Sequence, residues 1–167
     1  MRIVGIDPGS RSTGFGVIDV DGPQLTYVAS GCIRTAKGTH VARLEEIFHS
    51  MGEVLQQYAP GEVALEKVFV HRNADSAIKL GQARSAALCA AYGVIESSQV
   101  YEYTPRSVKQ AVTGYGAAEK SQIQVMIKSL LKLDGALNED AADALAVAVC
   151  HANGRRAGHA IARATGA

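Results

Sequence analysis

Apolar residues at the start of the chain occur in short runs that are interrupted by turn residues. The run Ile3–Ile6 ends on a carboxylate at Asp7, and Pro8-Gly9 breaks it before the apolar pattern resumes over Gly14–Ile18. Because proline cannot donate to a β-ladder and glycine permits tight turns, this stretch predicts a hairpin with an acid at a strand end. Ordinary turn chemistry is the alternative for Asp7. A further run, Gln24–Arg34, predicts a third strand and an antiparallel meander.

The pattern then changes to a helical period. Apolar residues recur three and four positions apart over Val41–Tyr58 and leave a charged opposite face, which predicts a helix that ends before Pro60. The short apolar segment Val63–Phe69 predicts a strand, and the preceding helix favours a parallel neighbour. Its one misfit is Glu66, because a carboxylate among apolar residues is costly to bury unless it is paired or bound to a metal. A solvated acid at the strand edge is the alternative.

Asn73 can cap a helix over Ala74–Tyr92 that Gly93 ends. Small residues recur every fourth position on this helix and predict a groove that another element can approach closely. Two partners for this groove stay open, the sheet of the same chain and the equivalent helix of a second subunit. The groove consists of Ala77, Gly81, Ser85 and Cys89.

The next elements are a strand over Val100–Thr104, a short helix from Pro105 to about Val112, and, after a glycine loop, a helix over Ala118–Leu133. The last of these helices has polar residues every fourth position, which is typical of a solvated surface. Because this face lies beside Lys109 and a flexible loop, it is also a candidate phosphate-binding face. The face consists of Lys120, Gln124, Lys128 and Lys132.

Asn138 is a suitable cap for a final helix over Glu139–His151. Asp140 and Asp143 are three positions apart, so their carboxylates project from one face. Compensation of the helix dipole explains acids in the first turn, but it explains Asp143 less well. Residues 153–167 are rich in Gly, Ala and Arg without an apolar period, and they predict a disordered basic tail after a single domain over residues 1–152.

The composition agrees with one globular domain of 167 residues, 47% of them apolar and 20% charged. Uninterrupted apolar segments long enough to span a membrane are absent from the sequence, and the start of the chain does not have the pattern of a secretory signal. Three cysteines without metal-ligand spacing predict buried, reduced thiols and a cytoplasmic location. The net charge of +1 means that any affinity for a polyanion must come from local arrangement.

Four carboxylates stand out as misfits on three apolar elements. Acids that converge repel each other unless divalent cations lie between them, and oxygen ligands without a Cys or His cluster favour Mg²⁺, with Mn²⁺ as a substitute. Two such ions can support hydrolysis of a phosphodiester, so a nucleic-acid backbone is the expected substrate. The four candidate ligands and catalytic residues are Asp7, Glu66, Asp140 and Asp143.

At this point the chain resembles the RuvC family of bacterial crossover (Holliday) junction resolvases. The resemblance runs in order to about Ala152. The motifs that support it are Gly5-Ile-Asp-Pro-Gly-Ser-Arg11 with Thr13-Gly14, Glu66–Phe69, Asn73–Ala77 with Lys79–Arg84, Ala118–Gln122, and Asp140-Ala-Ala-Asp-Ala-Leu-Ala146.

The resemblance implies an α/β, ribonuclease H-like fold whose five-stranded mixed sheet has antiparallel strands 1 to 3 and parallel additions, flanked by helices. It also implies a homodimer that cuts two opposed strands of a four-way DNA junction with magnesium, two ions per active site, and the branch-migration proteins RuvA and RuvB as partners. The family's catalytic acids fall on the four acids above. DNA contacts are expected at Phe69, Arg72, Lys109 and Lys120, and a dimer interface at Ala77, Gly81 and Ser85.

Three rival functions remain. An actin-like kinase or ATPase also opens on a strand and a glycine hairpin, but it needs a second domain for which 167 residues leave no room. A catalytically inactive junction-binding or adaptor dimer of the same fold would gain nothing from clustered acids. A general nuclease, indifferent to junction structure, is the third.

Overall fold

The computed structural model describes the backbone of residues 1–68 and 73–165 and the side chains up to residue 156. The chain begins with the predicted meander, formed by β1 (Arg2–Asp7), β2 (Ser12–Asp21) and β3 (Gln24–Arg34). Helix α1 (His40–Tyr58) leads to β4 (Glu62–Glu66), and α2 (Ala74–Tyr92) leads through a short 3₁₀ turn, η1 (Ser97–Gln99), to β5 (Val100–Tyr103). Three helices complete the chain: α3 (Pro105–Thr113), α4 (Lys120–Leu131) and α5 (Glu139–Thr165).

The strands form one mixed sheet in the order β3-β2-β1-β4-β5. Strands β1, β2 and β3 pair antiparallel, whereas β4 pairs parallel with both β1 and β5. The five-stranded mixed sheet predicted from the sequence is therefore confirmed. It also places the carboxyl ends of β1 and β4 side by side at one edge of the sheet.

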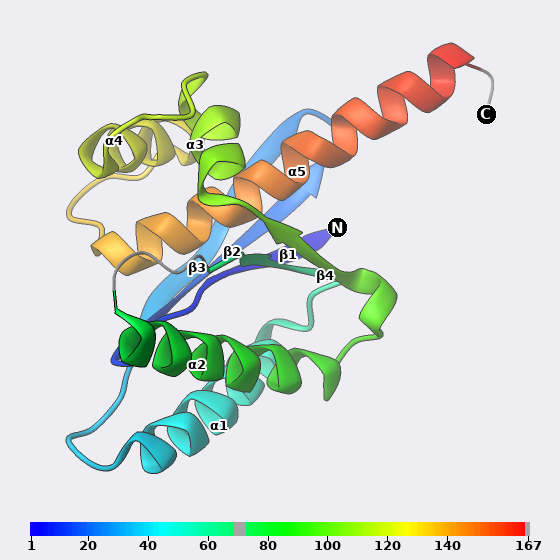
Figure 1. Cartoon of the computed structure of the whole chain (residues 1–167). Coiled ribbons are helices and arrows are strands. Elements are labelled where there is room, and N and C mark those ends of the chain that lie inside the picture. Colours follow the sequence, from blue (N-terminus) through cyan, green and yellow to red (C-terminus); the bar gives the residue numbers. More distant parts are fainter. Residues whose placement is uncertain (69–72, 166–167) are drawn as a thin grey trace.

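Helices cover both faces of this sheet, with α1 and α2 on one side and α3, α4 and α5 on the other (Figure 1). Alternate strand residues divide between the two cores because successive side chains point to opposite faces. Ile3 faces the α3–α5 side, whereas Val4 and Ile6 face α1 and α2. None of the helices in the described part of the chain has the length and apolar character required to cross a membrane.

Helix α5 packs against β1 and β2 unusually closely because glycines face it. A Cβ added at Gly5 would lie 2.1 Å from the carbonyl oxygen of Ala144, and one added at Gly14 would lie 2.0 Å from that of Asp140. These separations are far below van der Waals contact, so larger residues would force the helix away from the sheet. The glycines of the first hairpin thus allow α5 to pack at short distance from the sheet.

Several sequence predictions need correction. Strand β4 ends at Glu66, and Phe69 and Arg72 lie outside the described residues. Helix α5 continues to Thr165, so the backbone of residues 153–165 is helical where a disordered tail was predicted. At the start of this extension, Arg155 pairs with Glu62 and the Arg156 side chain donates to the carbonyl of Gly22.

The cysteine prediction is correct in part. The three cysteines are free thiols, and Cys150 is buried as expected. Cys32 is only half-buried, and Cys89 is exposed on α2. The alanine-rich surroundings of Cys89 suggested burial, but its side chain lies on the face of α2 that points away from the sheet.

Candidate active site

The first two acids come from adjacent parallel strands. Asp7 is the last residue of β1 and Glu66 is the last residue of β4, and the preceding residues Ile6 and Leu65 are register partners. Asp7 also lies opposite Gly14 of β2. The sheet therefore brings Asp7 and Glu66 to one edge, as their positions at apolar strand ends predicted.

The other two acids come from the first turns of α5. Asn138 directly precedes α5, and its side-chain oxygen accepts a hydrogen bond from the backbone N–H of Asp140 at 3.0 Å. The close approach of α5 to Gly14 then places Asp140 beside β2. Asp143 lies one turn further along and is half-buried, with 18% of its side chain exposed. The compact hairpin thus brings the acids of α5 to the edge that holds Asp7 and Glu66.

The acids influence each other electrostatically. Burial, followed by the charges of Glu66, Asp143 and Asp140, raises the pKa of Asp7 from its ordinary 3.8 to about 8. Burial and the charge of Asp143 likewise raise the pKa of Glu66 to about 7. At neutral pH and without a further positive charge, this edge therefore retains protons on some of its carboxyl groups. An arrangement of this kind favours a bound cation, which would displace those protons.

Lys120 is in direct contact with one of these acids. Its ammonium donates to Asp143 at 3.1 Å and pairs with Glu139 at 2.7 Å, and these bonds raise the pKa of the lysine. The same charge lowers the pKa values of Asp7 and Glu66, and Lys109 also lowers the pKa of Glu66. Both lysines singled out from the sequence thus lower pKa values at this edge, and Lys120 contacts it directly. We call this edge, with Asp7, Glu66, Asp140 and Asp143, the acidic edge.

The donor set suits a hard divalent cation. Carboxylate oxygens are the ligands that Mg²⁺ and Mn²⁺ prefer, and no histidine or thiolate is needed to complete such a site. Among the residues that the structure describes, no three acidic, histidine or cysteine side chains gather tightly enough to ligate one ion as they stand. Lys120 pairs with both Glu139 and Asp143, so its single charge offsets only part of the negative charge at this edge. A bound divalent cation would attract the carboxylates and offset the repulsion between them. The residue types at this edge therefore fit such an ion.

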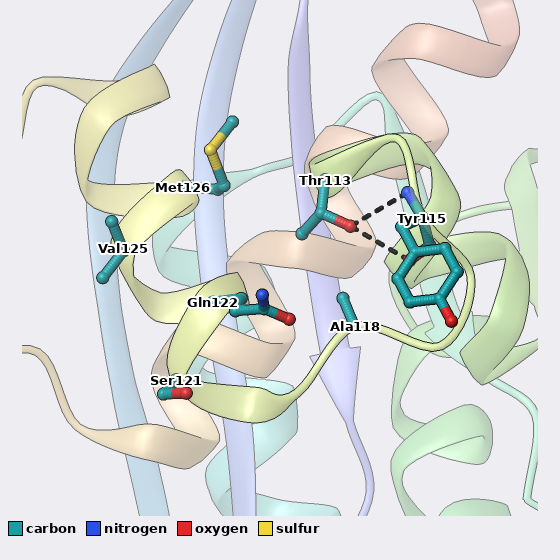
Figure 2. Close-up of a pocket in the computed structure, with 7 residues that line it drawn as sticks. All are labelled: Thr113, Tyr115, Ala118, Ser121, Gln122, Val125 and Met126. Atoms are coloured by element: carbon teal, nitrogen blue, oxygen red, sulfur yellow. Dashed lines mark hydrogen bonds between the residues drawn. The ribbon is translucent and has the colours of Figure 1, made fainter.

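A pocket of about 410 Å³ lies between the end of α3, the following loop and α4, as Figure 2 shows. Tyr115 forms part of its rim, and the Thr113 hydroxyl accepts from the Tyr115 N–H at 3.2 Å. The pocket is lined by Thr113, Tyr115, Ala118, Ser121, Gln122, Val125 and Met126. The four acids are not part of its lining. It is a separate feature beside the segment that carries Lys120.

The small-residue groove of α2 is not buried against the sheet of its own chain. The residues of α2 that pack inside are Ala83, Ala87, Ala90 and Ala91. Gly81 is half-buried, and a Cβ added there would meet nothing within 4 Å. The intrachain alternative for this groove is therefore wrong. The face with Ala77, Gly81 and Ser85 remains accessible, and its role as a dimer interface stays a prediction.

One polar contact at this edge was not foreseen. The Ser12 hydroxyl donates to Oδ2 of Asp140 at 2.5 Å. In the sequence Ser12 lies among the polar residues of the first turn, where nothing distinguishes it from Ser10. Such a contact joins residues 128 positions apart, so it becomes visible only when β2 and α5 are placed together.

Comparison with known proteins gives consistent matches. The family model of the crossover junction endodeoxyribonuclease RuvC matches residues 3–151. The protein of that name from Dichelobacter nodosus (strain VCS1703A) is 53% identical over 152 residues, which cover 91% of this chain and 85% of that protein. The structure of Thermus thermophilus RuvC in complex with a Holliday junction substrate is similar with a TM-score of 0.84 at 35% identity, over 95% of this chain and 96% of that chain.

A more distant solved structure shares the fold alone. The yeast mitochondrial Holliday junction resolvase is 10% identical with a TM-score of 0.70, over 98% of this chain and 83% of that chain. The arrangement of the mixed sheet and its helices is therefore common to proteins with few residues in common.

Proposed function

The chain belongs to the family of the crossover junction endodeoxyribonuclease RuvC, and we propose that it resolves four-way (Holliday) DNA junctions in recombination and repair by cutting two opposed strands. The observation that supports this function best is the convergence of acids from β1, β4 and α5 at one edge of the sheet, where burial and their mutual charge raise the pKa values of Asp7 and Glu66. A protein that merely bound DNA would gain nothing from such a cluster, because negative charge repels phosphates.

In the proposed mechanism, Asp7, Glu66, Asp140 and Asp143 would hold two magnesium ions, for which manganese could substitute. When bound, such ions would supply an activated water and stabilise the leaving oxygen of a phosphodiester. The protein's own contribution is to hold the four acids in place. Asp7 and Glu66 are fixed by paired strands, so the acidic edge is rigid on that side. The backbone positions of the two acids on α5 are fixed by the close packing of that helix on the hairpin.

Lys120 and Lys109 would attract the DNA backbone to this edge. The Lys120 side chain is 61% exposed although its ammonium contacts Asp143, so a phosphate can reach the same ammonium. Lys109 lies on α3, close enough to Glu66 to lower its pKa. Together they provide positive charge beside an edge that would otherwise repel the substrate.

Paired cutting requires two sites, and we assign the second to another copy of the chain. The accessible small-residue face of α2 supports a two-fold helix pair, which would place two equivalent sites against two equivalent strands. Phe69 and Arg72 are further proposed DNA contacts. The cytoplasm as location and RuvA and RuvB as partners are proposed from the family.

Cleavage of synthetic DNA tests this function. Purified protein is incubated with a four-way junction and with a linear duplex of matching sequence, each with Mg²⁺ and with chelator. We expect paired nicks in the junction only, and only with metal. Asp7→Asn should still bind the junction but should not cut it. Equal cutting of the duplex would refute junction selectivity, and binding without cutting by the unaltered protein would favour the inactive adaptor.

A further inference from the structure

The carboxylate of Asp140 accepts a hydrogen bond from a residue on a different element. Ser12 is the first residue of β2, and its hydroxyl donates to Oδ2 of Asp140 at 2.5 Å. We propose that Ser12 is a positioning residue that orients the Asp140 carboxylate for binding of a divalent cation. This inference rests on the proposed function, since it assigns Asp140 to the cation site.

The backbone on the serine side is held in place. Thr13 is fully buried, and its hydroxyl donates to the carbonyl of Gly9 at 2.8 Å while it accepts from the Gly9 N–H at 3.3 Å. This pair of bonds closes the turn that precedes Ser12. On the other side, β2 continues in register with β3, where Ser12 lies opposite Arg34. The hydroxyl of Ser12 therefore projects from a rigid position.

The backbone on the Asp140 side is also held, but by different groups. The Asn138 side-chain oxygen accepts from the Asp140 N–H at 3.0 Å and from the Cys32 thiol at 2.9 Å. Gly14 lies against the Asp140 carbonyl and leaves no room for a Cβ. These contacts place the Cα of Asp140 but leave its carboxylate free to rotate. The hydrogen bond from Ser12 is what fixes the direction of that carboxylate.

The two candidate metal ligands on α5, Asp140 and Asp143, are held by donors of different charge. Lys120 contacts Asp143 as a cation and offsets part of its charge, whereas Ser12 contacts Asp140 as a neutral hydroxyl. A neutral donor orients a carboxylate without cancelling the charge that attracts a metal. Ser12 engages Oδ2, and no side chain in the described part of the protein donates to Oδ1, which is the available ligand atom. Partners of this kind around metal-ligating carboxylates contribute to affinity through orientation.

A matched pair of variants tests this role. Ser12→Thr keeps the hydroxyl and Ser12→Val replaces it with a methyl group of the same shape, and both β-branched residues suit a strand. Binding of Mn²⁺ to the DNA-free protein is measured from the EPR signal of the free ion. We expect Ser12→Val to bind Mn²⁺ about 10- to 100-fold more weakly and Ser12→Thr to bind nearly as well as the unaltered protein.

Two controls separate orientation from general destabilisation. Ser30→Ala removes a hydroxyl of β3 that shares a 3.2 Å bond with Tyr27, and it should leave Mn²⁺ affinity unchanged. Unfolding temperature and binding of the junction in chelator are measured for every variant. Ser12→Val should bind the junction in chelator as the unaltered protein does, because the hydroxyl is assigned no DNA contact.

The outcomes are distinct. Equal Mn²⁺ affinity of Ser12→Val and Ser12→Thr would overturn the positioning role, even if both variants were less stable. If the two Ser12 variants bind equally and Asp140→Asn binds Mn²⁺ more weakly, the proposed site stands while the role of Ser12 fails. If Asp140→Asn and Asp7→Asn both bind like the unaltered protein, the acidic edge is not the cation site and both proposals fall.

Discussion

The replacement Asp7→Asn should stabilise the protein when no metal is present. Asp7 is the most strongly perturbed acid of the candidate site, because burial and then Glu66, Asp143 and Asp140 raise its pKa to about 8. Asparagine has nearly the same shape as aspartate but cannot ionise. The substitution therefore removes the electrostatic cost of an ionisable group at this position and leaves the strand pairing of β1 intact.

The magnitude follows from proton linkage. Between pH 3.8 and about 8 the folded protein keeps a proton on Asp7 that the unfolded chain has lost. The free energy of unfolding consequently falls as pH rises through this window, by at most about 1.4 kcal/mol for each pH interval of one. At pH 7 the upper bound is about 4 kcal/mol relative to asparagine. Because water reaches part of this edge, we expect about 1 to 3 kcal/mol.

Urea denaturation in chelator, followed at several values between pH 4.5 and 8, measures this difference. The gain of Asp7→Asn over the unaltered protein should grow with pH and level off near pH 8, where Asp7 is ionised in both states. Asp134→Asn, in the exposed turn after α4, is the matched control and should show no comparable gain. A gain that is equal at pH 4.5 and pH 8, or no gain at all, would refute the reasoning. Added Mg²⁺ should stabilise the unaltered protein more than Asp7→Asn.

Three other variants give separate predictions. Lys120→Ala should flatten the dependence of junction affinity on salt, by up to about 0.9 in the slope of log K against log [salt], and titrations at four salt concentrations would detect it. Gly81→Ala should weaken self-association in sedimentation experiments, whereas Gly52→Ala, at an equally open position on α1, should not. Both substitutions should stabilise their helices by up to about 1 kcal/mol, because alanine favours a helix over glycine. Gly14→Ala should lower the free energy of unfolding by about 1 to 3 kcal/mol or more in urea, because its Cβ would overlap the Asp140 carbonyl. Normal stability of Gly14→Ala would show that α5 can shift without cost.

Much of the fold was predictable because its signals are local. Alternating and helical apolar periods, with caps at Asn73 and Asn138, indicated the strands and helices, and the bounds of α2 agree with the prediction. Long-range contacts account for the differences. Helix α5 extends past its apolar stretch, where Arg155 and Arg156 reach Glu62 and Gly22.

The candidate site was predictable to the extent that its members are misfits in their own elements. Each acid is conspicuous among apolar neighbours, and the topology explains why they meet at one edge. Ser12 was not predictable, because a serine in a polar turn is unremarkable until α5 lies beside it. A similar reason applies to His151, which is buried with its ring bonded to Tyr103 and Glu62 at 2.7 and 2.6 Å. Sequence periodicity alone does not reveal such partners.

The central claim is that acids from three elements form one divalent-cation site. Crystals of the protein grown with Mn²⁺, and an anomalous difference map recorded at the manganese absorption edge, test it most directly. We expect strong peaks between the carboxylates of Asp7 and Glu66 and those of Asp140 and Asp143, and their loss or marked weakening in Asp7→Asn. Manganese bound elsewhere, with this edge empty at saturating metal, would contradict the account.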